Sequence, residues 1–186
     1  MPNAFNPFYT LNSANCSFVV DCRDNAPTIL YWGSRLTDAT SPEMLALLAT
    51  RQELQACPPE EAPIALSPEM AAGFAGSPGV QIHRNGRQWA VYTQIESARS
   101  SDNQLIIISL CQGTEIQLTH CLRLDADTDV LTATTEITNR GTSTLWVDRC
   151  DAPCIPLPMH YNKILGFTGR WANEFQLQSI DRVAGA

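Results

Sequence analysis

Residues 116–139 read IQLTHCLRLDADTDVLTATTEITN, and this stretch decides the fold class. Apolar side chains occupy most alternate positions on both sides of a short acidic segment, interrupted by His120 and Thr135, and this period of two is typical of strands with one buried face. The segment between them, residues 125–129, carries three aspartates and suits a turn. We therefore predict two consecutive antiparallel strands. The apolar positions are Ile116, Leu118, Leu122, Leu124, Leu131, Ala133 and Ile137.

The pattern continues on both sides of this stretch. Residues 104–110 form an apolar run, as expected of a strand buried on both faces. Asn85-Gly86 separates two β-prone runs, residues 80–84 and 87–92, which predicts a hairpin with a two-residue turn. Further strands are expected at residues 8–11, 16–20 and 28–32 and around residues 145–147. Such a series of short strands and turns predicts a mainly β, antiparallel sandwich or a large curled sheet.

One segment departs from the strand pattern after the third expected strand. Ser41-Pro42-Glu43 supplies an N-cap, a first-turn proline and an acidic residue ahead of apolar positions at helical spacing. We predict one short helix over residues 42–54. A similar start at Ser67 is stopped by Gly73 after about one turn.

Composition narrows the possible partners. The 186 residues are 44% hydrophobic and 17% charged, with a formal net charge of −7. Nucleic acid is an unsuitable partner because binding it requires a basic patch. No run approaches the ~20 apolar residues of a membrane span, and the first 20 residues lack the features of a signal peptide. With an odd count of seven cysteines, these features favour reduced thiols and a cytoplasmic location, with no membrane partner.

Candidate catalytic and metal sites are weak. Asp125, Asp127 and Asp129 alternate as in a calcium loop, but Val130 stands where that loop requires glycine, so we expect a hairpin turn. His120 lies among leucines, which favours a core histidine. No Ser-His-Asp set, phosphate loop or zinc pattern can be assembled from local motifs. We therefore predict no catalytic residue, no metal and no cofactor in this chain.

The segment at residues 166–174 reads GFTGRWANE and concentrates unusual side chains. Arg170 can stack on Trp171, and Glu174 can hold the guanidinium by two hydrogen bonds. Such pairing lowers the pKa of a carboxyl, which is wrong for a general acid. We predict a structural or interface role for these three residues.

Two stretches together resemble the N-terminal domain of family 36 glycoside hydrolases, the bacterial α-galactosidases. Residues 29–36, ILYWGSRL, are similar to a strand of that family that ends in Tyr-Trp-Gly. Gly169, Trp171 and Glu174 match the family's Gly-x-Trp-x-Arg-Glu motif, while Asn173 stands in place of its arginine. The resemblance spans nearly the whole chain.

This resemblance implies an antiparallel β-supersandwich similar to the galactose-mutarotase-like fold. It implies that residues 1–186 are a single N-terminal domain, truncated before the (β/α)₈ barrel whose aspartates carry the retaining mechanism. The chain alone is then inactive, and the parent hydrolyses terminal α-galactosides. The expected partners are the barrel of the same protein, further copies of the chain in a homo-oligomer, and α-galactoside sugars. Residues expected to contact substrate or another domain are Trp32, Arg35, Arg170, Trp171 and Glu174; residues 37–63 form a loop with the same expected role.

Two alternatives remain at the level of sequence. A free-standing carbohydrate-binding module could use Trp32, Trp89, Trp146 and Trp171 as stacking faces for sugar rings. An epimerase-like enzyme on the same fold could use His120 and Glu174, although no motif places them together.

Overall fold

The structure is a computed structural model that describes residues 6–50, 64–157 and 161–182. The chain divides into two compact units, Met1–Pro156 and Leu157–Ala186, and each is described by itself. Strands dominate both units, and the one α-helix of the described residues follows the third strand. The predicted mainly β, antiparallel fold with a short helix after its third strand is therefore confirmed.

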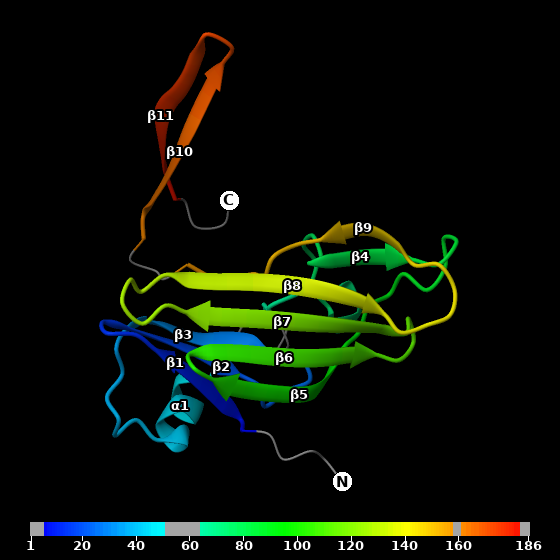
Figure 1. The fold of residues 1–186 in the computed structure, drawn as a ribbon, viewed down its shortest axis with the longest axis horizontal. Coiled ribbons are helices and arrows are strands. Elements are labelled where there is room, and N and C mark those ends of the chain that lie inside the picture. The colour runs from blue at the N-terminus through cyan, green and yellow to red at the C-terminus, as the bar shows by residue number, and fades with distance from the viewer. Residues whose placement is uncertain (1–5, 51–63, 158–160, 183–186) are drawn as a thin grey trace, which may run out of the picture. The chain divides into compact units, whose positions relative to one another are not determined.

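The first unit contains two antiparallel sheets and a two-stranded ribbon (Figure 1). One sheet has the order β1-β2-β3 and the other the order β5-β6-β7-β8. The ribbon pairs β4 with β9. The strands are β1 (Phe8–Asn12), β2 (Cys16–Asp21), β3 (Thr28–Ser34), β4 (Val80–His83), β5 (Gln94–Ser101), β6 (Gln104–Cys111), β7 (Ile116–Leu124), β8 (Leu131–Asn139) and β9 (Trp146–Cys150).

The four-stranded sheet confirms the prediction made from residues 116–139. β7 and β8 pair in register from Ile116 opposite Asn139 to Leu124 opposite Leu131. β6 departs from the expectation of a strand buried on both faces, because its buried and half-buried residues alternate. Leu105 and Ile107 lie in the core, whereas Ile106 and Ile108 lie on the other face.

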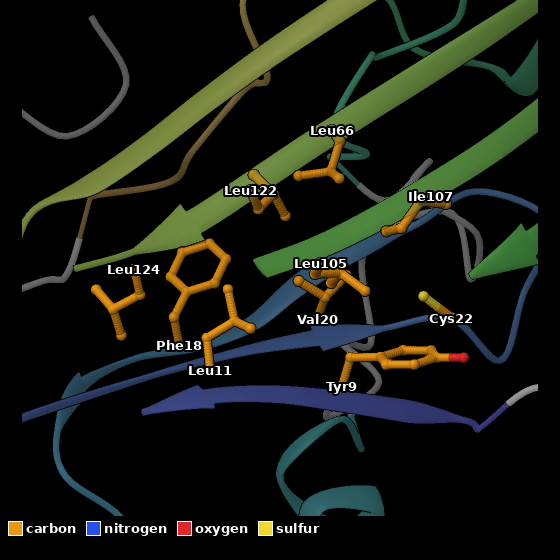
Figure 2. Close-up of a cluster of buried hydrophobic side chains, with 10 residues drawn as sticks. All are labelled: Tyr9, Leu11, Phe18, Val20, Cys22, Leu66, Leu105, Ile107, Leu122 and Leu124. Carbon is orange, nitrogen blue, oxygen red and sulfur yellow. The ribbon is translucent and has the colours of Figure 1, made fainter. Parts of the chain in front are cut away.

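The main core lies between the two sheets. Figure 2 shows side chains from β1 and β2 meeting side chains from β6 and β7. Phe18 and Val20 are fully buried on β2, and Leu105 and Leu122 are fully buried on the facing sheet. Burying apolar surface on both sides of this layer is the main stabilising contribution to the sandwich. A second cluster joins β4 to the other end of the four-stranded sheet through Val80, Ile82, Val91, Cys111, Ile116 and Leu118.

Polar groups separate the two core clusters. His120 is 2% exposed, and its Nε2 lies 2.8 Å from the buried Ser67 Oγ. Burial lowers the pKa of His120 to about 4, so the ring is neutral at pH 7. This agrees with the expected core histidine.

The turn between β7 and β8 is the predicted acidic hairpin turn. Asp125 Oδ1 accepts hydrogen bonds from the Thr128 backbone N–H and hydroxyl. Asp129 accepts from the Ser13 hydroxyl and from the Asn15 side-chain amide, both in the turn between β1 and β2. The Asp125 carboxylate therefore closes its own turn, and the Asp129 carboxylate fastens one sheet to the other at this end of the sandwich.

Helix α1 spans Pro42–Leu48, so its predicted end at Leu54 is wrong. Ser41 caps its start by accepting from the Met44 N–H, as predicted. A seven-residue helix is too short to be stable from propensity alone and depends on packing. Only Leu45 of this helix is buried, and Met44, Leu47 and Leu48 are exposed. Residues 51–63 of the predicted loop lie outside the described residues.

The second unit is a hairpin of β10 (Lys163–Arg170) and β11 (Asn173–Asp181). Residues 166–174 therefore form the end of a hairpin. Gly169 has φ +155°, and a Cβ there would lie 2.6 Å from the Glu174 Cα. Only glycine fits this bulge at the end of the hairpin. Across the described residues, no helix is long and apolar enough to cross a membrane.

Candidate functional site

A groove opens beside β4, where the sequence predicts an uninterrupted hairpin. The Asn85-Gly86 turn forms as expected, with φ values of 51° and 75° and paired hydrogen bonds between the backbones of Arg84 and Arg87. The strand pairing then stops, because Gln88 adopts φ 53° and β4 pairs with β9 instead. The predicted strand at residues 87–92 is therefore wrong. The two sides of the turn separate and become two walls of a groove.

The groove has a volume of about 480 Å³. This volume lies within the range of small-molecule sites, about 300–1,000 Å³. Apolar side chains line much of it, and Trp89 is 61% exposed. Glu69, Gln81, His83 and Asp148 add polar groups to the same walls. An exposed aromatic beside convergent polar groups makes this groove the candidate binding site of the first unit.

Glu69 places a fixed carboxylate in the wall of the groove. The residue is 5% exposed, and Oε1 accepts from the Thr93 hydroxyl at 2.6 Å. Oε2 accepts from the Thr93 N–H at 3.0 Å. Burial raises the pKa of Glu69, and its hydrogen bonds with Thr93 partly offset that rise. The carboxylate is thereby held in one orientation, and it joins segments 24 residues apart.

His83 is oriented by three neighbours. Its Nδ1 accepts a hydrogen bond from the Gly86 N–H at 3.2 Å, which places the proton of the neutral ring on Nε2. Its ring stacks against Trp146 with centroids 6.1 Å apart. Its Nε2 lies 3.7 Å from the Asp148 Oδ2. This separation exceeds a hydrogen bond, so a donor and an acceptor face the groove side by side.

The buried Ser67–His120 pair is not equipped for nucleophilic catalysis. Ser67 and His120 are 5% and 2% exposed, so a substrate has no access to them. His120 Nδ1 has no hydrogen-bond partner, whereas a catalytic histidine is oriented by a third group. The same burial removes His120 from the surface position that an epimerase would require. Across the described residues, no group of three or more His, Cys, Asp or Glu side chains could hold a metal ion.

Comparison with known proteins decides the family. The glycosyl hydrolase family 36 N-terminal domain matches residues 25–186. The chain belongs to this family. The resemblance seen in residues 29–36 and 166–174 is thereby confirmed. No curated protein sequence matches the chain.

Solved structures of family 36 enzymes share the fold. An α-galactosidase from Lactobacillus brevis superposes with a TM-score of 0.76 at 16% identity, over 97% of this chain. A family 36 α-galactosidase from Geobacillus stearothermophilus in complex with raffinose gives a TM-score of 0.77 at 14% identity, over 96% of this chain. The galactosidase domain of an α-galactosidase–sucrose kinase gives 0.77 at 16% identity, over 94%. The chain spans 28% of the length of each.

Two of the predicted contact residues in this family 36 domain lie at the end of β3. Trp32 is half-buried and meets the Phe18 ring edge-on, with centroids 6.2 Å apart. It therefore packs against the main core. Arg35 is exposed, and its Nη1 donates to the Ser13 carbonyl at 2.6 Å. The Tyr-Trp-Gly-Ser-Arg stretch thus fastens the end of β3 to the turn between β1 and β2, and its role in substrate contact stays a prediction.

The other three predicted contact residues lie in the hairpin of the second unit. Trp171 occupies the turn and is 93% exposed. The Glu174 Oε1 accepts from the Ala172 N–H at 3.0 Å. The predicted Glu174–Arg170 ion pair does not form, since the described ion pairs are Arg23–Asp21, His83–Asp148 and Arg149–Asp151. In this family 36 domain, the motif shapes the end of a hairpin, and its interface role stays a prediction.

Sequence reasoning missed the groove. The sequence marks Trp89 only as one of four tryptophans, and it gives no reason to single out His83 or Glu69. The chain departs from the hairpin at Gln88, two residues after Gly86, and nothing in this residue type predicts its positive φ. β4 pairs with β9 across 70 residues between Val80 and Cys150 and 63 residues between His83 and Trp146. Local sequence patterns do not encode such long-range pairing.

Proposed function

We propose that this chain is the N-terminal accessory domain of an α-galactosidase-like retaining glycoside hydrolase. Both units belong to one domain, and catalysis takes place in a separate (β/α)₈ barrel of the same protein. The match of the family 36 N-terminal domain to residues 25–186 carries this proposal. The 28% share of the length of the similar α-galactosidases supports it, because most of those chains lies outside the matched part.

The experiment compares the 186-residue chain with its full-length parent. We expect the parent to hydrolyse an aryl α-galactoside and the isolated chain to show no turnover. Turnover by the pure chain that is lost when one of its own acidic residues is replaced would contradict the proposal. A parent that cleaves other glycosides but no α-galactoside would retain the accessory role and overturn the substrate assignment.

We also propose that the domain contributes to a homo-oligomer and to contacts with the barrel. Two exposed apolar surfaces support this role, because contiguous apolar patches commonly mark interaction sites. On α1, Leu47 is 73% exposed. On the hairpin, Leu165, Phe167, Phe175 and Leu177 are each at least 65% exposed.

The oligomer is tested on the full-length parent by sedimentation velocity. Replacing Leu47 with Glu places a charge on the apolar surface of α1, and we expect a smaller assembly if this surface lies in a subunit interface. The control is Asp38→Lys, which changes the charge at an exposed position just before the helix. An unchanged assembly for both Leu47→Glu and a Phe167→Glu variant would contradict this part of the proposal.

The location of the parent stays an expectation from the sequence. We propose that it is cytoplasmic, on the basis of the odd cysteine count. Fractionation of cells that express the natural protein would test this.

A further inference from the structure

We propose that the groove beside β4 is a binding site for a neutral pyranose sugar. We name its four central residues, Trp89, Glu69, His83 and Asp148, the groove quartet. The inference takes its first choice of sugar, an α-galactoside, from the proposed function, while the site itself is argued from the geometry of the groove.

The aromatic wall suits one face of a sugar ring. Trp89 lines the groove and is 61% exposed, so its ring is accessible to a ligand. Val80, Ile82 and Val91 extend the apolar lining. A pyranose presents a patch of C–H groups on one face, and an aromatic ring is a suitable surface for it because it buries apolar area without requiring hydrogen bonds.

The polar wall suits a hydroxyl group. His83 accepts a hydrogen bond at Nδ1 and so offers an N–H at Nε2, and Asp148 offers an acceptor 3.7 Å away. A hydroxyl is both a donor and an acceptor, so one hydroxyl can accept from His83 and donate to Asp148. A ligand with acceptors alone would satisfy only His83, and one with donors alone would satisfy only Asp148. The pair therefore favours an alcohol.

Glu69 supplies a second acceptor. Its Oε1 takes two hydrogen bonds from Thr93, whereas Oε2 takes one and retains acceptor capacity. Because Glu69 is held by Thr93, it meets a ligand without losing side-chain freedom, which reduces the entropic cost of binding. Two acidic residues in the quartet also disfavour anionic ligands such as sugar phosphates.

The volume sets the size of the ligand. A groove of about 480 Å³ accommodates one or two sugar rings. We therefore expect a monosaccharide or a disaccharide unit to occupy it, with longer oligosaccharides extending into solvent.

The test titrates the 186-residue chain with methyl α-galactopyranoside, raffinose and methyl β-glucopyranoside. Two-dimensional NMR of the tryptophan indole N–H groups monitors each titration. We expect saturable shifts of the Trp89 signal. Trp89→Ala should weaken binding about tenfold, given what an aromatic contact contributes. Asp148→Asn should weaken it by about fivefold or more, since it changes one acceptor of the hydroxyl pair.

Trp171→Ala is the matched control, because it removes an exposed tryptophan in the other unit. It should bind sugar as the wild type does, and circular dichroism should confirm that each variant is folded. Loss of binding in Trp171→Ala but not in Trp89→Ala would overturn the assignment. So would the absence of saturable binding by any of the three sugars, or tighter binding of tetramethylammonium, which would indicate a cation site. Binding of the glucoside alone would retain the groove and count against the galactoside, independently of whether the parent hydrolyses α-galactosides.

Discussion

The Ser67 hydroxyl lies 2.8 Å from His120 Nε2 in a layer where both side chains are buried. Ser67 comes from the segment before β4, and His120 comes from the centre of β7. This contact crosses 53 residues of sequence and satisfies one of the two ring nitrogens of the histidine. The pair lies between the two apolar clusters, where burial lowers the pKa of His120 to about 4 and keeps its ring neutral at pH 7.

The first prediction concerns the pH dependence of stability. The pKa of His120 is about 4 in the folded chain and 6.5 when unperturbed. Between these values the unfolded state binds more protons, so acidification destabilises the fold. The free energy of unfolding should fall by up to about 3 kcal/mol as the pH drops from 6.5 to 4, and this contribution should then level off. Urea denaturation at a series of pH values measures it.

The variant His120→Gln tests the assignment. It should lose the part of the slope between pH 4 and 6.5 that is due to the imidazole. Because Glu69 has a raised pKa and titrates with the opposite sign, the difference between variant and wild type is the informative quantity. His83→Gln removes the imidazole of a partly exposed histidine and serves as the matched control. An unchanged slope in His120→Gln would show that the ring is not buried and neutral.

The second prediction concerns the buried Arg84. Its guanidinium donates hydrogen bonds to oxygens of three segments. Nη1 donates to the Ser143 carbonyl at 2.6 Å. Nη2 donates to Asn139 Oδ1 at 2.6 Å and to the Thr114 carbonyl at 3.2 Å. Arg84→Met should destabilise the fold by about 3 kcal/mol, since several acceptors lose their donor. Arg87→Met, at the exposed position across the same turn, should change stability by less than about 0.5 kcal/mol. Equal losses of stability for Arg84→Met and Arg87→Met in thermal denaturation would show that these hydrogen bonds do not stabilise the fold.

The third prediction concerns the two glycines of the hairpin. A Cβ at Gly169 would collide with the Asn173 carbonyl and the Glu174 Cα, whereas a Cβ at Gly166 would meet nothing within 4 Å. Gly169→Ala should therefore disrupt the paired end of the hairpin, and Gly166→Ala should leave it intact. Nuclear Overhauser effects between the opposed residues Arg170 and Asn173 report on the pairing at this end. Retention of the Arg170–Asn173 pairing in Gly169→Ala would show that the bulge tolerates a side chain.

The fourth prediction compares the two faces of β6. Ile107→Ala empties a fully buried position and should cost about 2–5 kcal/mol. Ile106→Ala alters a half-buried position on the opposite face and should cost about 1 kcal/mol. Denaturant unfolding of both variants measures the difference. Equal costs would restore the expectation that β6 is buried on both sides.

Strand positions were predictable where one face is buried and the partner is a neighbour in sequence. β7 and β8 follow this rule because their alternating pattern fixes the register and the acidic turn fixes the connection. The β1–β2 hairpin follows it as well. The end of α1 was not predictable, since Leu47 and Leu48 continue a helical pattern that the structure leaves exposed. There the apolar pattern does not mark burial within this chain.

The groove was not predictable for a different reason. Asn85-Gly86 determines the turn, but a turn does not determine how far the strands beyond it pair. β4 instead pairs with β9, and the positive φ of Gln88 directs the chain away. Arg84 and His120 likewise gain their partners only through long-range packing. The residues next to them in the sequence therefore do not indicate that Arg84 binds three segments or that His120 pairs with Ser67.

The carboxylate of Asp129 has a consequence for how this domain tolerates change. Because it holds the turn between β1 and β2, the connection between β7 and β8 sets the distance between two layers as well as closing one hairpin. An insertion beside Asp127, whose side chain is exposed, leaves that fastening in place. Lengthening the chain between Asp129 and Leu131 would instead shift the anchor relative to its own strand. Variation in loop length should therefore accumulate on one side of this turn and not on the other.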